Sequence, residues 1–309
     1  MEQIHTIYNA HMRIHHLLAL VAIADKGSFT RGARSLNISQ SSLSHAMTDL
    51  EDELQVSLFV RDRQGAHLTE IGRRVLTHAR QALRSMDSIR SEAGAARGVL
   101  SGQVRIGSIP SATVSFLPRV IADFGRQYRK VEVVLLEEPS QGIEPLTDWL
   151  RTGTIDLALV ELPAHGFKVT PLIDDEMLAI VSRGSAFARR KRLSVVDLAE
   201  EPFVMSRYSS ERLIHEAYAQ QDLSPVVRFE VQDLGTLVSM VREGLGISIV
   251  PRVAFSTTPP GVALVPMFPR IRREVGFAMN GPQESLPAVA AFAERLRELS
   301  RTRALRRLQ

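Results

Sequence analysis

The start of the chain alternates between hydrophobic runs of helical spacing and short polar breaks. Apolar side chains recur every three or four positions in residues 14–26, 28–36 and 40–54, and Gly27 and the turn 37–39 separate these runs. The asparagine of that turn tolerates the left-handed geometry that ends a helix, and its serine can cap the next helix. The pattern predicts three short helices, of which the last two meet at a steep angle as a helix-turn-helix.

The third predicted helix has one edge that suits contact with DNA bases, because it is short, uncharged and able to form hydrogen bonds. A glutamine can pair with adenine, and small serines let a helix sink into the major groove. A basic hairpin at 61–69 follows, which is typical of a wing laid against the phosphate backbone or minor groove. The predicted DNA contacts are Ser28, Thr30, Ser39, Gln40, Ser41, Ser42, Ser44, His45, Arg61, Arg63, His67 and Thr69. For Ser44, a solvated helix turn is an equal alternative.

A long helix is predicted from Thr69 to about Arg97, and its apolar positions form a continuous seam. The spacing of these positions is that of a heptad repeat, and many are alanines, which favours close approach of the same helix from a second subunit. Packing on its own domain is the alternative. The seam positions are Val75, Ala79, Ala82, Met86, Ile89, Ala93 and Ala96.

Beyond Gly98 and Gly102 the pattern changes to strands alternating with helices, which is typical of an α/β region with a mainly parallel sheet. The first part predicts strands at 104–107, 131–137 and 155–160 with helices at 116–128 and 141–152; the second predicts strands at 178–182, 203–206, 227–231 and 247–250 with helices at 210–221 and 234–243; a strand at 274–280 and a helix at 286–303 close the chain.

An ordered string of residues along this pattern resembles the LysR-type transcriptional regulators. In the first part it comprises Phe29-Thr30, Ala33, Leu36, the run Ser39 to Ser44, Leu50-Glu51, Leu54, Leu58 to Arg61 and Leu68 to Gly72; in the second it comprises Gly153 to Ala158, Gly244 to Pro251 and Ala291-Phe292. Two positions depart from the family pattern. Gly32 stands where an alanine is common, and Gln55 where a glycine usually closes the helix before the wing.

The resemblance implies a fold and an assembly. The expected fold is an all-α winged helix-turn-helix domain and a long linker helix, followed by an α/β effector region of two Rossmann-like lobes that is similar to periplasmic binding proteins. The expected divisions are 1–68 for the DNA-binding domain with its leader, 69–98 for the linker helix, 103–177 with 267–303 for lobe I, and 178–266 for lobe II. The resemblance further implies a dimer through the linker helix and a dimer of dimers that bends a promoter.

Candidate ligand contacts follow the carboxyl ends of the predicted strands, where ligands of open α/β sheets bind. They are Ser108, Ser111, Ser140, Ser206, Arg207, Ser209 and Thr236. Each serine can equally be a helix cap, and the resemblance supports Ser111, Ser140 and the Ser206 loop. Arg207 beside helix N-termini suggests a small carboxylate as the effector, with a solvated Arg207 as the alternative.

Charge and composition add limits. The net charge of +4 is spread evenly, since residues 1–102 carry twelve basic and ten acidic side chains. The DNA prediction therefore rests on pattern, and a few phosphate contacts per subunit imply that several subunits bind together. The C-terminal arginines 301, 303, 306 and 307 suit a solvated helix end better than a second nucleic-acid contact. His11 and His15 are four residues apart, but with His16 they suit surface histidines better than a metal site, because a third ligand is lacking.

Several classes of protein are excluded or disfavoured. Zero cysteines exclude disulfides, thiolate metal sites and a cysteine nucleophile. The sequence contains no Gly-x-Ser-x-Gly elbow, Walker loop or His-Glu-x-x-His motif, so an enzyme is not expected, and neither is a catalytic residue, a metal or a cofactor. No apolar run reaches roughly 20 residues, and no secretory signal is evident, so we expect a cytoplasmic protein without membrane contact. The expected partners are double-stranded DNA with an inverted repeat, a small-molecule effector, further copies of the chain as a homodimer or homotetramer, and RNA polymerase as a candidate.

Overall fold

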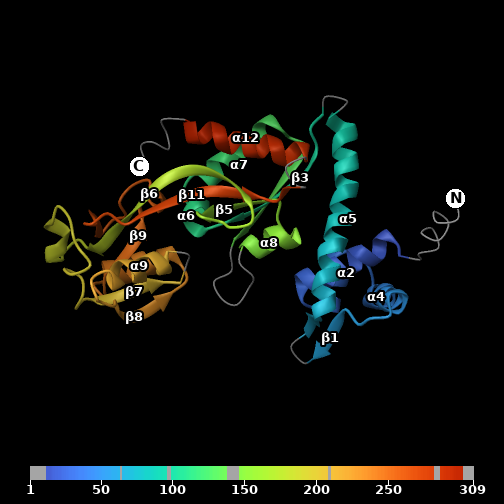
Figure 1. Cartoon of the computed structure of the whole chain (residues 1–309), viewed down its shortest axis with the longest axis horizontal. Helices are drawn as coiled ribbons and strands as arrows, with labels where there is room; N and C mark the ends of the chain where they lie inside the picture. The colour runs from blue at the N-terminus through green and yellow to red at the C-terminus, as the bar shows by residue number, and fades with distance from the viewer. Residues whose placement is uncertain are drawn as a thin grey trace. The chain divides into compact units, whose positions relative to one another are not determined.

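The structure is a computed structural model of the chain, and its elements fall into two compact units. The residues it describes are 12–62, 65–95, 99–137, 146–207, 210–281 and 286–301. The first unit contains residues 1–98 with 151–154, and the second contains 99–150 with 155–309. Each unit is described by itself below (Figure 1).

The first unit contains three short helices, a hairpin and one long helix. These are α2 (Ile14–Lys26), α3 (Phe29–Ser35), α4 (Gln40–Leu54), β1 (Phe59–Asp62), β2 (Gly65–Leu68) and α5 (Glu70–Ala95). Their apolar faces meet in one core, in which Leu20, Leu43 and Leu50 are fully buried. This arrangement confirms the predicted helix-turn-helix and wing, and Figure 1 shows α5 extending well past the three short helices.

Left-handed residues and a serine cap set the angles between these helices. Asn37 has φ 55°, and Ser39 Oγ accepts a hydrogen bond of 3.0 Å from the Ser42 amide, so α4 begins where the turn predicts. Gln55 has φ 53° and ends α4 in the left-handed conformation that a glycine adopts more easily. Gln55 therefore adopts, at this departure from the family pattern, the backbone conformation that a glycine favours.

The hairpin is tied closely to the start of α5. Thr69 Oγ1 accepts a 2.9 Å hydrogen bond from the Gly72 amide and donates a 2.8 Å bond to the Ser57 carbonyl oxygen. A Cβ added to Gly72 would lie 2.1 Å from the Leu58 carbonyl oxygen, so only glycine fits this crossing. Thr69 thus caps α5 and fixes it against the strand that leads into the wing.

The second unit is an α/β region. Its strands are β3 (Gly102–Ser108), β4 (Val131–Glu137), β5 (Leu157–Glu161), β6 (Lys168–Ser182), β7 (Pro202–Ser206), β8 (Val226–Val231), β9 (Ser248–Pro251), β10 (Val262–Pro266) and β11 (Arg272–Met279). Its helices are α6 (Pro110–Thr113), α7 (Leu117–Gln127), α8 (Leu146–Thr152), α9 (Glu211–Ala219), α10 (Leu234–Arg242) and α12 (Pro287–Arg301), with 3-10 turns η1 (Ala186–Arg189) and η2 (Arg252–Ala254).

Strand β6 joins two sheets, because its two halves pair with different neighbours. Residues 168–176 lie antiparallel to β11, and the order β6-β11-β5-β3-β4 forms lobe I. Residues 177–182 lie between β9 and β10, which with the β7–β8 pair form lobe II. Figure 1 shows β6 and β11 as long strands reaching from one lobe to the other.

The predicted sheet was only partly right. It is mixed rather than mainly parallel: β3 runs parallel to β4 and β5, but β11 is antiparallel to both β5 and β6. The first ten residues of β6 and the whole of β10 were not predicted as strands. Asp174, Asp175 and Pro171 made that part of β6 resemble a loop; its pairing with β11 is a long-range contact that outweighs local propensity.

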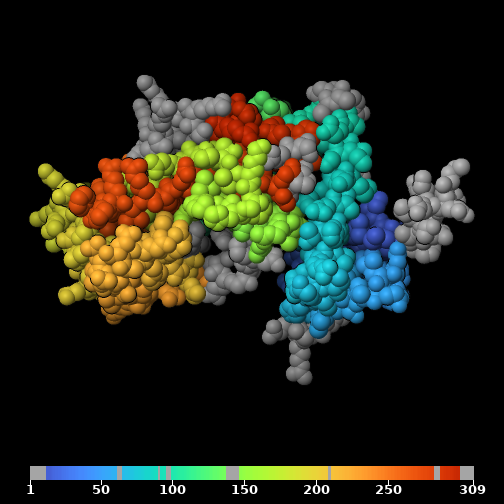
Figure 2. All heavy atoms as spheres, in the orientation of Figure 1, coloured from blue at the N-terminus to red at the C-terminus, as the bar shows by residue number. Residues whose placement is uncertain are grey.

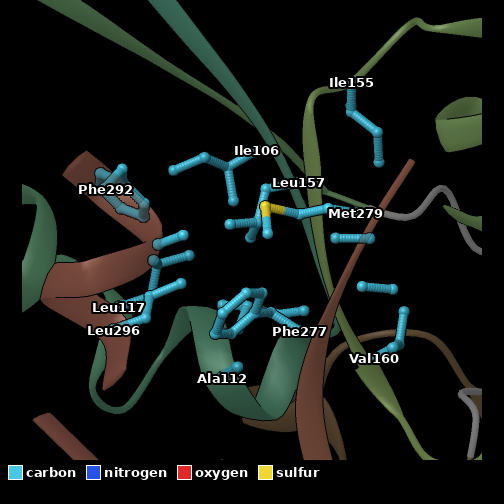
Figure 3. Close-up of a cluster of buried hydrophobic side chains, with 14 of the residues drawn as sticks. Ile106, Ala112, Leu117, Ile155, Leu157, Val160, Phe277, Met279, Phe292 and Leu296 are labelled. Atoms are coloured by element: carbon cyan, nitrogen blue, oxygen red, sulfur yellow. The ribbon is translucent and has the colours of Figure 1, made fainter. Parts of the chain in front are cut away.

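A single hydrophobic core supports lobe I. Phe277 of β11, Ile106 of β3 and Phe292 and Leu296 of α12 belong to one cluster, as Figure 3 shows, and all four are fully buried. The rings of Phe124 and Phe292 also meet edge to face at 5.0 Å. The core holds the ends of β3, β5 and β11 in fixed positions, and these ends carry the polar side chains described next.

Candidate functional site

The outward edge of α4 is exposed, as its polar pattern predicts. Gln40, Ser41, Ser42, His45 and Thr48 are all exposed, whereas the opposite face is buried in the core of the first unit. Side chains that reach solvent from a helix held rigidly by its neighbours can approach base edges without rearrangement of the backbone.

Hydrogen bonds pre-orient several of these side chains. Thr30 Oγ1 donates a 2.9 Å bond to Gln40 Oε1, which leaves the Gln40 amide nitrogen free to donate outward. Ser39 Oγ lies 2.8 Å from the hydroxyls of both Ser41 and Ser42, so these three serines form one polar cluster at the start of α4. The structure therefore brings Thr30, Gln40 and the serines together on one exposed surface.

The other predicted DNA contacts are less uniform. Ser44 and Ser28 are half-buried, and Thr69 serves as the cap of α5. His67 is exposed on β2. Arg63 and the side chain of Arg61 lie outside the described residues. Sequence reasoning missed one support of the wing: Glu51 accepts hydrogen bonds from the Leu58 and Phe59 amides and holds the start of β1.

The predicted seam on α5 divides into two parts. Ala79 is 3% exposed and Val75 is half-buried, and both pack on the core of their own unit. Ala82 and Ile89 are exposed, the latter to 69%, and Met86 is half-buried. In Figure 2 the atoms of α5, in cyan, form part of the outer surface of the first unit. The first turns of the seam therefore pack on their own domain, as the alternative has it, and the dimer seam stays a prediction for the later, exposed turns.

One of the three N-terminal histidines is not on the surface. His16 is 4% exposed, its Nδ1 accepts a hydrogen bond of 3.3 Å from the Arg13 amide, and its Nε2 lies 4.0 Å from Asp49 Oδ2. Burial and the adjacent His15 lower the pKa of His16 below its usual value. The prediction of a surface histidine was wrong for His16, because it caps α2 inside the core. Over the described ranges, no group of three metal-binding side chains occurs.

The second unit contains a cleft lined by residues of both lobes. Its cavity volume is about 40 Å³, whereas one water molecule needs roughly 10–15 Å³. Lobe I contributes Pro110, Ser111 and Arg273, and lobe II contributes Ser206, Ser210, Ile214, Leu234, Ile249, Val250, Pro251 and Ala254. The wall is mostly aliphatic, and two of its hydroxyls, those of Ser111 and Ser210, meet the side chain of Arg273, so the lining is typical of a small-molecule site.

Arg273 organises the polar end of the cleft. Its side chain is 1% exposed, and its Nε donates a 2.9 Å hydrogen bond to Asp175 Oδ2 on the neighbouring strand β6. Nη2 donates a 2.8 Å bond to Ser111 Oγ in lobe I, and Nη1 donates a 3.1 Å bond to Ser210 Oγ at the start of α9 in lobe II. One buried guanidinium therefore binds hydroxyls from both lobes.

Two buried carboxylates face this guanidinium. Asp175 is fully buried and also accepts a 3.0 Å hydrogen bond from the Val253 amide. Glu161, 9% exposed at the end of β5, places Oε2 3.8 Å from Arg273 Nη1. Burial raises the pKa of both carboxyls, although Arg273 opposes the rise in each case. The polar end of the cleft therefore combines one buried positive charge with two buried acids.

The predicted ligand contacts are only partly assembled in the cleft. Ser111 and Ser206 line it, whereas Ser108 is fully buried and donates a hydrogen bond to the Ile109 carbonyl oxygen. Thr236 is exposed and bonds through its amide and hydroxyl to Asp233 Oδ2. These bonds lower the pKa of Asp233 and make the pair a cap of α10.

Arg207 does not line the cavity. Its side chain is 46% exposed, and Nη1 lies 3.3 Å from Glu230 Oε2 on the adjacent strand β8. Arg207 thus matches the solvated alternative, with a surface ion pair in place of a ligand. Ser140 and Ser209 lie outside the described residues.

The arginine that does line the cavity was not predicted. Residue 273 fell one position before the predicted strand 274–280, and Asp175 fell before the predicted strand at 178–182. A signal was nevertheless present: three acidic residues follow Leu172-Ile173, and two arginines precede Glu274-Val275. Opposite charges placed beside hydrophobic strand segments suggest a buried pair, but only the register of β6 against β11 identifies which residues meet.

The fold and these two sites together define a class of protein, a DNA-binding regulator with an attached ligand-binding region. Residues 14–73 match the family model of the bacterial regulatory helix-turn-helix protein, lysR family, and residues 97–301 match the LysR substrate binding domain. The chain therefore belongs to the LysR family of transcriptional regulators. It binds DNA and carries an effector-binding domain, and it is a regulator rather than an enzyme.

Known relatives agree over nearly the whole chain. The HTH-type transcriptional regulator YvbU of Bacillus subtilis is 31% identical over 93% of this chain and 99% of its own length. The DNA-binding transcriptional dual regulator OxyR of Escherichia coli is also 31% identical, over 86% of this chain and 88% of its own. These matches include both units, so the order of DNA-binding and effector-binding regions is shared.

Solved structures show the same fold. A full-length variant of OxyR from Pseudomonas aeruginosa has a TM-score of 0.72 and 24% identity, covering 93% of this chain and 95% of that one. Full-length CbnR in complex with its target DNA has a TM-score of 0.64 and 21% identity, covering 93% and 100%. Within the described ranges, no helix of the present structure is long and apolar enough to cross a membrane.

Proposed function

We propose that this regulator reads an inverted repeat with the exposed edge of α4 from two subunits, and that a small molecule bound at Arg273 between the lobes changes how the subunits sit on DNA. The proposal places the protein in the cytoplasm as a homodimer or homotetramer, with RNA polymerase as a candidate partner. No metal or cofactor is part of it.

The observation that carries the effector part is the set of bonds made by Arg273. Because the same guanidinium holds Ser111 of lobe I and Ser210 of lobe II, a ligand that competes for either hydroxyl changes a direct link between the lobes. A ligand can shift a conformational equilibrium only by binding one state better than the other. A group that breaks or reinforces a bond between lobes supplies such a difference.

The cysteine count limits how this effector is sensed. Some relatives are named hydrogen peroxide-inducible genes activators, but this chain contains no cysteine. Its response therefore excludes thiol oxidation, and reversible occupation of the cleft is the mechanism that we propose.

Genomic selection by the purified protein, followed by footprinting with and without candidate small molecules, tests the whole proposal. The expected result is a protected inverted repeat whose protected length changes with one compound. In the variant Ala254→Trp, whose larger side chain fills the cleft, the compound should no longer change the protected length. The footprint of this variant without the compound should match that of the wild-type protein. Absence of enrichment over bulk DNA would contradict the proposal that the exposed edge of α4, here called the reading surface, recognises a DNA sequence. An unchanged response of Ala254→Trp would remove the cleft from the mechanism.

The dimer is tested separately at the open part of α5. Ala82→Glu places two like charges across a two-fold seam, so it should weaken dimers by at least about tenfold in dissociation constant. Gln81→Glu adds the same charge at the neighbouring exposed position and serves as the control. Sedimentation at several concentrations gives the association state, and equal behaviour of the two variants would place the interface elsewhere.

A further inference from the structure

Glu161 occupies an unusual position beside the cleft. It ends β5, and its side chain lies between two arginines from different elements: Oε1 is 3.2 Å from Arg212 Nη2 on α9, and Oε2 is 3.8 Å from Arg273 Nη1 on β11. Oε2 is buried and accepts no hydrogen bond from any described residue. A buried carboxylate oxygen in this state loses its hydration without a full replacement, which is unfavourable.

The charges around Glu161 do not balance inside the protein. Arg273 is the one buried guanidinium among them, and Asp175 on β6 already bonds to it at 2.9 Å. Arg212 is 57% exposed and divides its two terminal nitrogens between Glu161 and the outer Glu216 of the same helix. The buried part of the network therefore holds two acids and one base, so Glu161 is in excess.

The hydroxyls in the cleft are arranged as donors. Ser111 Oγ and Ser210 Oγ each accept a hydrogen bond from Arg273, and neither donates to a described residue. Ser206 also lines the cavity without a hydrogen bond from its hydroxyl within the described residues. A hydroxyl that accepts from a guanidinium has its own hydrogen free for another acceptor. The polar end of the cavity is thus suited to a ligand group that accepts several hydrogen bonds.

We propose that the effector is a small aliphatic or aromatic monocarboxylic acid, and that Glu161 makes its binding proton-linked. The acid group accepts from Ser111 and Ser210 and shares the charge of Arg273, while Glu161 takes up one proton from solution and becomes neutral. The overall change is one ligand anion and one proton bound per cleft, with no covalent step. This inference rests on the proposed function, since it assumes that the effector occupies this cleft.

Two further observations support it. Burial raises the pKa of Glu161, and the nearby Glu216 acts in the same direction, so the proton is already easier to acquire than on a free carboxyl. The cavity of about 40 Å³ and its aliphatic wall of Ile214, Leu234 and Ile249 fit the body of a short organic acid. A dianion would place a second charge against that wall, which is unfavourable.

The test is calorimetric titration of the full-length protein with acetate, propionate and benzoate, with acetamide and benzamide as uncharged matches. Between about pH 5.5 and 8 these acids are mainly ionised in free solution, so proton uptake on binding means that the complex holds one more proton than the separate partners, and Glu161→Gln shows whether Glu161 holds it. We expect the dissociation constant to rise by up to about tenfold per pH unit where free Glu161 is ionised. Titrations in buffers of different ionisation enthalpy should show uptake of close to one proton.

Two variants separate this mechanism from a general charge effect. Glu161→Gln should bind the acids with little pH dependence, and at least about tenfold more tightly at the upper end of the range, because the competing charge is absent. Glu216→Gln removes the same formal charge and a bond to the same Arg212, but on the exposed side. It should keep the pH dependence of the wild-type protein.

Several outcomes would overturn the inference. These are acid binding that is independent of pH in the wild-type protein, an equal slope in Glu161→Gln, amides binding as well as acids, or no acid binding to either protein at any pH. None of these touches the proposed function, which is decided by the footprint and by Ala254→Trp. If Ala254→Trp responds normally to its effector while the acids bind as expected, the proposed function fails and the cleft is an acid site without regulatory effect.

Discussion

The reading surface on α4 and the cleft at Arg273 differ in exposure, in charge and in the sequence separation of the residues that form them. The first is exposed, uncharged and built from residues within one short stretch, with Thr30 bonded to Gln40 ten positions away. The second is buried and charged, and its bond from Arg273 to Ser111 joins residues 162 positions apart. Substitutions on the exposed surface should change binding and leave stability intact, whereas removal of the buried positive charge should lower stability as well.

The largest effect is expected from Arg273→Met. It removes the base and leaves Asp175 and Glu161 as buried acids, which should lower the free energy of unfolding of the second unit by about 3–5 kcal/mol. Arg272→Met is the matched control, since Arg272 is 58% exposed, pairs with Asp174 at 2.8 Å, and should contribute less than about 1 kcal/mol.

Urea unfolding followed by tryptophan fluorescence measures this difference, because the sole tryptophan, Trp149, lies in the core of lobe I. Equal effects of the two arginine substitutions would show that the cleft network is no more important to stability than a surface ion pair, and would remove the contrast between the two sites.

The next effect is expected at the reading surface. Gln40→Ala combined with Ser42→Ala should reduce the preference for the operator over a scrambled site by about 1–3 kcal/mol for each base that is no longer recognised. The salt dependence of binding should stay the same, since no phosphate contact is removed. Competition titrations at fixed salt measure the preference. If it were unchanged while thermal unfolding also stayed the same, α4 would not be the element that reads the sequence.

A smaller effect is expected at Tyr218, in the core of lobe II. Its ring is fully buried against Phe203, its hydroxyl has no hydrogen-bond partner among the described residues, and burial raises its pKa to about 12. Tyr218→Phe should therefore raise the free energy of unfolding by up to about 1 kcal/mol. Tyr128→Phe is the control, because that hydroxyl accepts a 3.1 Å bond from Gln127. A clear loss of stability in Tyr218→Phe would reveal a partner for its hydroxyl.

The smallest effect is a difference in pH dependence between the two units. His16 has a lowered pKa, so the unfolded chain takes up a proton first as the pH falls below 6.5, and the first unit loses stability there. Glu161 has a raised pKa, so the unfolded chain releases its proton first as the pH rises above 4.5, and the second unit loses stability in that direction. His16→Gln and Glu161→Gln should each flatten one slope in urea unfolding across this range, and slopes of the same sign would contradict the assignment.

Local chemistry allowed much of the first unit to be predicted. The bounds of α2 and α4 follow from apolar spacing, from Gly27 and from the cap at Ser39, all within a few residues of the elements that they define. The exposed edge of α4 could be identified for the same reason, because helical periodicity alone decides which side chains face the core. The surface prediction for His16 was wrong and the role of Glu51 was missed, because each side chain accepts a hydrogen bond from a backbone amide, which helical periodicity does not reveal.

The sequence by itself determined the family, the order of the elements and the surface on α4, because these depend on residues close together in the chain. Only the tertiary structure decided the chemistry of the cleft. The sequence pattern favoured Arg207, but the antiparallel register of β11 with β6 and β5 buries Arg273 among Asp175, Glu161 and Ser111, whereas Arg207 remains at the surface. Strand register is a global property set by packing, so local residue patterns do not encode it.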